Sequence, residues 1–153
     1  MIDLAFAISS NAVDSEETFT KIKDAIDYII TYHGAERIRY AVVRFGSTSF
    51  EDISFQDVKT VDELREEIDQ LARPSGVPNL KEALEKVKDI FEKAPDRPGA
   101  KKFLVVVMDT KSSSGPEEIT REAEPLEKDE IKVGCLVSVT TFLYVNYIKI
   151  INT

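Results

Sequence analysis

The chain has 153 residues, with 28 acidic and 20 Lys or Arg side chains, and a formal net charge of −8 near neutral pH. This length suits one domain with a sizeable core, so we expect a single domain over residues 1–153. The negative charge, without any basic run, argues against a nucleic acid partner, and charged residues interrupt the apolar stretches too often for a membrane span. The single cysteine excludes an internal disulfide. Asp3 stands where a signal peptide would be basic or apolar, which indicates either a protein that is not secreted or an excised domain.

The first part of the chain predicts a buried strand, a helix and a hairpin. Residues 2–8 are almost wholly apolar and precede a polar turn, which is typical of a parallel strand buried on both faces. Apolar residues recur at helical spacing over residues 19–30, and Gly34 provides a left-handed cap soon afterwards. Residues 37–45 alternate in polarity and are rich in β-branched and aromatic side chains, and together with residues 53–55 they predict an antiparallel hairpin.

Three further helices are predicted in the rest of the chain. Thr60 and Glu63 have the spacing of a capping box, which marks the start of a short helix. An amphipathic helix follows over residues 80–91. Pro116 suits the first turn of another helix, and Pro125 must end or kink that helix because it lacks a backbone N–H.

Two more strands complete the pattern. Residues 103–108 form the most apolar stretch and predict a central strand, and residues 131–139 predict a second buried strand. The order is strand, helix, hairpin, helix, helix, strand, helix, strand. It predicts an α/β doubly wound fold, with a mostly parallel sheet, one antiparallel edge strand and helices on both faces.

Five stretches occur in a characteristic order along the chain, at residues 3–8, 19–24, 39–45, 81–84 and 103–109. Together they resemble the von Willebrand factor type A domain, and the resemblance covers nearly the whole chain. It implies a Rossmann-like fold and a non-enzymatic module for adhesion or matrix assembly. It also implies a protein ligand, with matrix or collagen-like proteins among the candidates, and an extracellular or secreted location, as for most family members.

The resemblance further implies a metal-ion-dependent adhesion site at the carboxyl end of the sheet. The family uses D-x-S-x-S after the first strand, a loop Thr before the third helix and an Asp after the fourth strand. The matching positions here are Ser9, Asn11, Val13, Pro78 and Asp109, of which Asp109 alone keeps the family residue. Mg²⁺ prefers about six hard oxygen ligands, and Val13 and Pro78 offer no side-chain oxygen. We therefore expect no bound metal or cofactor, or else a weak Mg²⁺ or Ca²⁺ site at Ser9, Asn11 and Asp109.

Two alternatives stay open at this stage. One is a metal-dependent adhesion domain in which Ser10, Asp14 or Ser112 supplies substitute ligands. A remote one, from a different class, is a small α/β hydrolase or phosphotransfer enzyme that uses Asp109, because sheets of this kind bind ligands at the carboxyl ends of their strands. The sequence contains no glycine-rich nucleotide fingerprint and no obvious base for such an enzyme, so we expect a protein without catalytic activity.

The other chemically versatile residues have structural explanations. His33 falls at a helix carboxyl end, where a cation suits the helix dipole. Cys135 lies among apolar residues of a strand and is expected to be a buried, inert thiol. The acidic runs at residues 62–67 and 116–124 predict solvated helix faces, with an acidic docking surface for a basic partner as the functional alternative.

The tail, residues 140–153, departs from the family pattern. Residues 142–145 resemble the sixth strand and residues 146–151 the beginning of the last helix, but only Thr140 and Thr141 precede them. Neighbouring parallel strands need a crossover of about a dozen residues. The tail must therefore extend the fifth strand, fold back as an antiparallel edge or exchange with another molecule, and self-association through it is one expected outcome.

Overall fold

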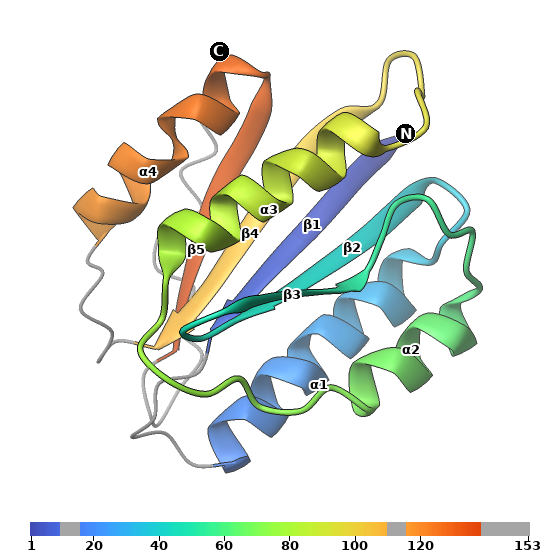
Figure 1. Ribbon diagram of the computed structural model, residues 1–153. Coiled ribbons are helices and arrows are strands. Elements are labelled where there is room, and N and C mark those ends of the chain that lie inside the picture. Colours follow the sequence, from blue (N-terminus) through green and yellow to red (C-terminus); the bar gives the residue numbers. More distant parts are fainter. Residues whose placement is uncertain (10–15, 110–115, 139–153) are drawn as a thin grey trace.

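The computed structural model describes residues 1–9, 16–109 and 116–138 of the chain. Its elements, in chain order, are β1 (Ile2–Ser9), α1 (Glu16–His33), β2 (Ile38–Phe45), β3 (Ser49–Ile53), α2 (Val61–Asp69), α3 (Leu80–Lys93), β4 (Lys101–Asp109), α4 (Pro116–Lys128) and β5 (Ile131–Ser138). The five strands form one sheet in the order β3-β2-β1-β4-β5 (Figure 1).

The central strand of this sheet is β1, which pairs in parallel with both β2 and β4. β5 continues the parallel sheet beyond β4, whereas β3 pairs antiparallel with β2. The predicted mostly parallel sheet with one antiparallel edge strand is therefore confirmed. The carboxyl ends of all four parallel strands lie at one edge of the sheet, where this class of fold places its binding sites.

Helices cover both faces of the sheet and form two separate cores. α1 and α2 lie on one face and α3 and α4 on the other (Figure 1). Alternate residues of β1 point to opposite faces, so Phe6 and Ile8 share a core with residues of α1 and α2, whereas Ala5 and Ala7 share a core with residues of α3 and α4. All four side chains are at most 1% exposed. The strand is thus buried on both faces from residue 5 onward, as its continuous apolar run predicts.

The helix ends follow the local sequence. Thr60 and Glu63 form the predicted capping box at the start of α2, with reciprocal side-chain to backbone hydrogen bonds. α1 ends at His33, and Gly34 takes a positive φ of 70°, which suits a residue without a Cβ.

The hairpin and α4 differ in detail from the prediction. The turn after β2 is so short that β3 starts at Ser49, and Phe55 lies beyond the strand, where its ring packs 4.9 Å from that of Phe91. α4 continues past Pro125 to Lys128, so the proline does not end the helix. A proline here removes one helical hydrogen bond close to the end of α4, and the buried Leu126 holds the last turn against the sheet.

The prediction of a buried strand is wrong for residues 132–135 of β5. Lys132 is exposed, and Val133, Gly134 and Cys135 are only half-buried. β5 is the last strand of the described sheet, and no described helix lies over it on the side of α1 (Figure 1).

A buried ion cluster closes the opposite end of the sheet, where the strands begin. Asp3 is only 3% exposed, and both of its carboxylate oxygens accept hydrogen bonds from Arg39, at 2.9 and 2.7 Å. Arg97 donates a third bond to the same carboxylate at 2.8 Å. The sequence pattern gave no sign that this acidic residue would be buried in the first strand.

Candidate functional site

The candidate site lies at the carboxyl edge of the sheet, where β1 and β4 end side by side. Ile8 pairs with Val107 of β4, and Ser9 pairs with Phe45 at the end of β2. Ser9 is 1% exposed, and its Oγ has no hydrogen-bond partner among the described residues. A buried hydroxyl without a partner is uncommon in proteins, so this edge holds a polar group that is able to accept or donate.

A loop before α3 is tied to this edge by the backbone. The Ser47 N–H, just after β2, donates to the Ser75 carbonyl oxygen at 3.0 Å, and the Asn79 N–H donates to the Gly46 carbonyl oxygen at 2.8 Å. These two hydrogen bonds place the half-buried Pro78 at the same edge as the end of β2.

Gly46 permits this close approach. A Cβ at this position would lie 1.9 Å from the Ser75 carbonyl oxygen, far inside contact distance. Gly76, with a φ of 82°, is equally constrained, since its Cβ would lie 2.6 Å from the Ser47 Oγ. Sequence reasoning missed this packing of two loops, although a glycine directly after a predicted strand was an available signal.

The first turn of α3 completes the arrangement. The side-chain oxygen of Asn79 accepts a hydrogen bond from the Glu82 N–H at 3.2 Å and so caps the helix. Glu82 in turn accepts a bond from the Ser49 N–H at 3.0 Å. The turn before β3, the loop and α3 are therefore joined into one unit by hydrogen bonds.

The structure places only part of the predicted ligand set. Ser9 and Pro78 lie at the expected edge, whereas Asn11, Val13 and the side chain of Asp109 lie outside the described residues. The substitute ligands considered above, Ser10, Asp14 and Ser112, lie outside them too.

The residues that are described do not fit a divalent cation. Ser9 supplies one hydroxyl and Pro78 no side-chain oxygen, whereas Ca²⁺ takes six to eight oxygen ligands and Mg²⁺ is usually held by one or two carboxylates together with several waters. Across residues 1–9, 16–109 and 116–138, no three His, Cys, Asp or Glu side chains are grouped as metal ligands would be.

His33 and Cys135, the residues best suited to nucleophilic catalysis, do not lie at the candidate site. His33 is exposed at the end of α1, with its ring edge-on to that of Tyr32 at 5.0 Å. Cys135 is half-buried in β5 rather than fully buried as predicted, and burial raises its pKa to about 11. Its thiol is therefore protonated at neutral pH, which makes it a poor nucleophile.

Comparison with known proteins bears on the family and the fold of the chain. The family model of the von Willebrand factor type A domain matches residues 3–138. Proximal thread matrix protein 1 from the mussel byssus superposes with a TM-score of 0.77 in one crystal form, at 18% identity over 90% of this chain and 38% of that one. Another structure of that protein has a zinc-occupied MIDAS motif.

Two further solved structures share the fold. The manganese-loaded TRAP protein of Plasmodium vivax gives a TM-score of 0.73 at 15% identity, over 92% of this chain and 58% of that one. BatB from Bacteroides thetaiotaomicron gives 0.68 at 13% identity, over 94% of this chain and 74% of that one. With 36% and 38% of the mussel protein covered in two of its structures, this chain spans little more than a third of that protein's length.

Proposed function

Because the chain belongs to the von Willebrand factor type A domain family, whose members are typically protein-interaction modules, we propose that it binds a protein ligand without catalysis and without a bridging metal ion. The proposal rests on the residues found at the carboxyl ends of the parallel strands. The family's aspartate position holds Ser9 and the loop threonine position holds Pro78, so two oxygen ligands of the family site are changed or lost.

Surface complementarity then has to supply the affinity. The outward faces of α2 and α4 carry exposed carboxylates, including Asp62, Glu66, Glu117 and Glu124, and the chain as a whole has a net charge of −8. Such a surface favours a basic protein partner and repels acidic ones. We propose a matrix-type ligand, such as a collagen-like chain with basic residues, and hence an extracellular setting.

None of the helices in the described ranges has the length and apolar character needed to cross a membrane.

Metal titration tests the proposal directly. We expect the melting temperature of the full chain to stay unchanged, without a saturable rise, in millimolar Mg²⁺, Mn²⁺ or Ca²⁺, because a ligand that binds only the native state would raise it. Asp109→Ala is the matched variant. A metal-dependent rise that Asp109→Ala abolishes would contradict the proposal and would support the metal-dependent alternative.

The hydroxyl of Ser9, which has no hydrogen-bond partner among the described residues, favours that alternative as the second candidate, since a bound cation would give the oxygen a partner. Isothermal titration of the wild type and of Ser9→Ala separates the two. If a site uses Ser9, the wild type releases or absorbs heat with Mg²⁺ and the variant loses it. If the hydroxyl is merely structural, both titrations are flat.

Ligand binding provides the second test. Binding to immobilised fibrillar collagen, measured by surface plasmon resonance, is expected to be the same in EDTA and in Mg²⁺ and to weaken as salt is raised, because exposed charges are screened. Binding that needs Mg²⁺ would count against the metal-independent mode, and no binding in either buffer would count against a collagen-like ligand.

A further inference from the structure

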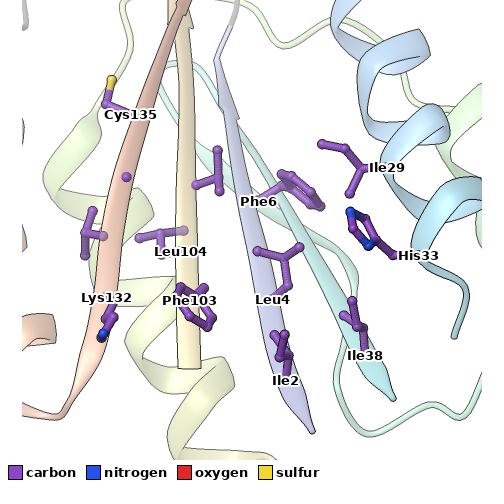
Figure 2. A pocket seen from close by; sticks show the side chains of 13 residues that line it. Ile2, Leu4, Phe6, Ile29, His33, Ile38, Phe103, Leu104, Lys132 and Cys135 are labelled. Atoms are coloured by element: carbon purple, nitrogen blue, oxygen red, sulfur yellow. The ribbon is translucent and has the colours of Figure 1, made fainter. Parts of the chain in front are cut away.

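Two tyrosines are exposed on the outer side of α1. Tyr28 is 68% and Tyr32 is 72% exposed, so most of each residue faces solvent. Their neighbours Ile29 and His33 line an apolar pocket over β1 and point toward the strands (Figure 2). Successive residues of a helix are turned by about 100°, which directs the two tyrosines away from the sheet. The tyrosines therefore form a surface of their own, apart from that pocket.

The two tyrosine rings stack on each other. Their centroids lie 6.0 Å apart with the planes 18° from parallel, and the ring of His33 lies edge-on to that of Tyr32 at 5.0 Å. The opposite side of α1 is anchored in the core by four buried side chains, Phe19, Ile22, Ile26 and Ile30. A rigid helix thus presents the rings in a preformed arrangement, which lowers the entropic cost of binding.

Asp24 extends the two tyrosines into a row along the helix. Asp24, Tyr28 and Tyr32 follow one another at the spacing i, i+4, i+8 within α1, so their side chains lie one above the other. Eight residues of helix span about 12 Å. These three residues are called the tyrosine row below.

The carboxylate in the tyrosine row is available to a partner. Glu17 of the same helix pairs with Lys21 at 2.8 Å, and Asp27 pairs with Arg65 of α2 at 2.7 Å. Asp24 is exposed between them and has no ion-pair partner among the described residues. The row therefore combines two open aromatic faces with one uncompensated negative charge.

An arginine side chain matches both parts of the tyrosine row. A guanidinium group is attracted to the face of a tyrosine ring, and it can pair with a carboxylate through two parallel N–H donors. Lysine carries the same charge on a compact, strongly hydrated ammonium group and lacks the planar fork. The net charge of −8 on the whole chain also attracts a basic partner from a distance.

We propose that the tyrosine row binds an arginine-bearing segment of the protein ligand. One guanidinium lies on the Tyr28 ring and pairs with Asp24, and a second lies on the Tyr32 ring. The midpoint between Asp24 and Tyr28 is six helical residues, or about 9 Å, from Tyr32, and an extended peptide covers this distance in about three residues. The inference rests on the proposed function, because it takes the ligand to be a basic protein.

Titration of the full chain with synthetic peptides, followed by amide NMR, tests the proposal. The peptides consist of four Gly-Ser-Arg repeats or of the same repeats with lysine or glutamine in place of arginine. Tyr28→Leu combined with Tyr32→Leu removes both rings but keeps apolar side chains, and Tyr28→Phe combined with Tyr32→Phe keeps the rings. Circular dichroism checks that each variant folds.

Asp24→Asn tests the carboxylate independently of the rings. Glu127→Gln is its matched control, because it removes the same charge from an exposed position on α4, on the other face of the sheet (Figure 1).

We expect the arginine peptide to shift the amide signals of residues 24–33 more than those of the other helices. It should bind about threefold or more tightly than the lysine peptide, because the guanidinium group stacks on the rings. The double leucine variant and Asp24→Asn should each weaken binding by about threefold or more relative to Glu127→Gln. The double phenylalanine variant should bind as the wild type does.

Equal binding of the arginine and lysine peptides, or signals shifted equally over α2 and α4, would indicate general charge attraction and would overturn the proposal. So would unchanged binding in the double leucine variant, or no binding of the arginine peptide. A dimer in sedimentation analysis that the double leucine variant abolishes would identify a second copy as the occupant and would overturn it too. If the full chain still binds immobilised collagen in any of these cases, the proposed function stands and the tyrosine row alone is excluded as its binding surface.

Discussion

At the scale of single residues, the buried carboxylate of Asp3 is costly to disturb, because it is 3% exposed and paired with two arginines. Its two arginine partners, Arg39 and Arg97, come from β2 and from the segment before β4. One side chain therefore ties together three regions that are distant in sequence. Burial alone would raise the pKa of Asp3, but the hydrogen bonds and charges of Arg39 and Arg97 outweigh it and hold the pKa below its usual value.

Asp3→Asn should lower the free energy of unfolding at pH 7 by about 3 kcal/mol, because it leaves two partly buried guanidinium groups without a counter-charge. A carboxyl with a lowered folded-state pKa contributes stability above its unfolded pKa of about 3.9 and loses it as the pH falls through the folded value. Urea unfolding at pH 7 and pH 3 measures the change, and the difference between wild type and variant should shrink at pH 3.

The control for this variant is Asp89→Asn, which removes an exposed pair with Lys93 on α3. Exposed pairs contribute little to stability, so this variant should unfold almost as the wild type does. If both variants lost the same free energy of unfolding, the Asp3 cluster would contribute no more to stability than an exposed ion pair.

Gly46 is the second residue whose identity is fixed by its surroundings. Gly46→Ala should lower the free energy of unfolding by about 2 kcal/mol, as overpacking does, because the new methyl group would overlap the Ser75 carbonyl and displace the loop before α3. Amide exchange at Ser47 and Asn79, whose N–H groups make the loop hydrogen bonds, should also become faster.

Gly134→Ala serves as the comparison for Gly46→Ala. A Cβ on Gly134 would meet only the Leu104 carbonyl oxygen, at the ordinary distance of 3.9 Å. If the two alanine variants had the same stability and the same exchange rates, the close approach of the two loops would not constrain Gly46.

At the scale of elements, the stability of the short helix α2 depends strongly on the capping box in its first turn. It has only nine residues, and its outer face is charged. Hydrogen bonds from the backbone and the hydroxyl of Thr60 hold the pKa of Glu63 below its usual value, which shows how closely the two residues are joined.

Thr60→Ala should lower the free energy of unfolding by about 1 kcal/mol, the usual effect of losing an N-cap side chain. Thermal unfolding followed by circular dichroism measures it. Thr20→Ala provides the control, because Thr20 is exposed in the second turn of α1, inside the helix rather than at its cap, and its hydroxyl donates a hydrogen bond to the carbonyl of Glu16. A larger loss in Thr20→Ala than in Thr60→Ala would show that the capping box does not stabilise α2.

Prediction from sequence was accurate for elements with a clear period or cap and failed where a neighbour decides the outcome. The capping box of α2 and the parallel strand β1 were found because their signals are local. β5 was predicted to be buried, since its apolar run looks like that of β4, but burial depends on what lies beyond the strand. Pro125 was expected to end or kink α4, and it does not end the helix, which continues to Lys128.

At the scale of the whole molecule, the doubly wound sheet and its antiparallel edge were predictable because strand and helix signals alternate along the chain. The metal-site positions stay a prediction, because Asn11, Val13 and the side chain of Asp109 lie outside the described residues. Ser9 and Pro78 fall at the expected edge, but the contact between the loops at Gly46 and Ser75 arises from residues 29 positions apart, and no local pattern reports such a contact. The ion cluster at Asp3 joins residues up to 94 positions apart.

The central position of β1 also has a consequence for how the chain folds. Ile2 pairs with Lys101, so the middle of the sheet cannot close until nearly a hundred intervening residues are present. Parallel pairings between such distant segments make folding slow, because a large loop must be ordered before the contacts form. During synthesis, β1 can pair with β2 early, but its other side stays without a neighbour until β4 has been made. Ala5 and Ala7, which pack with residues of α3 and β4, stay exposed until then, and this is when a chaperone would be most useful.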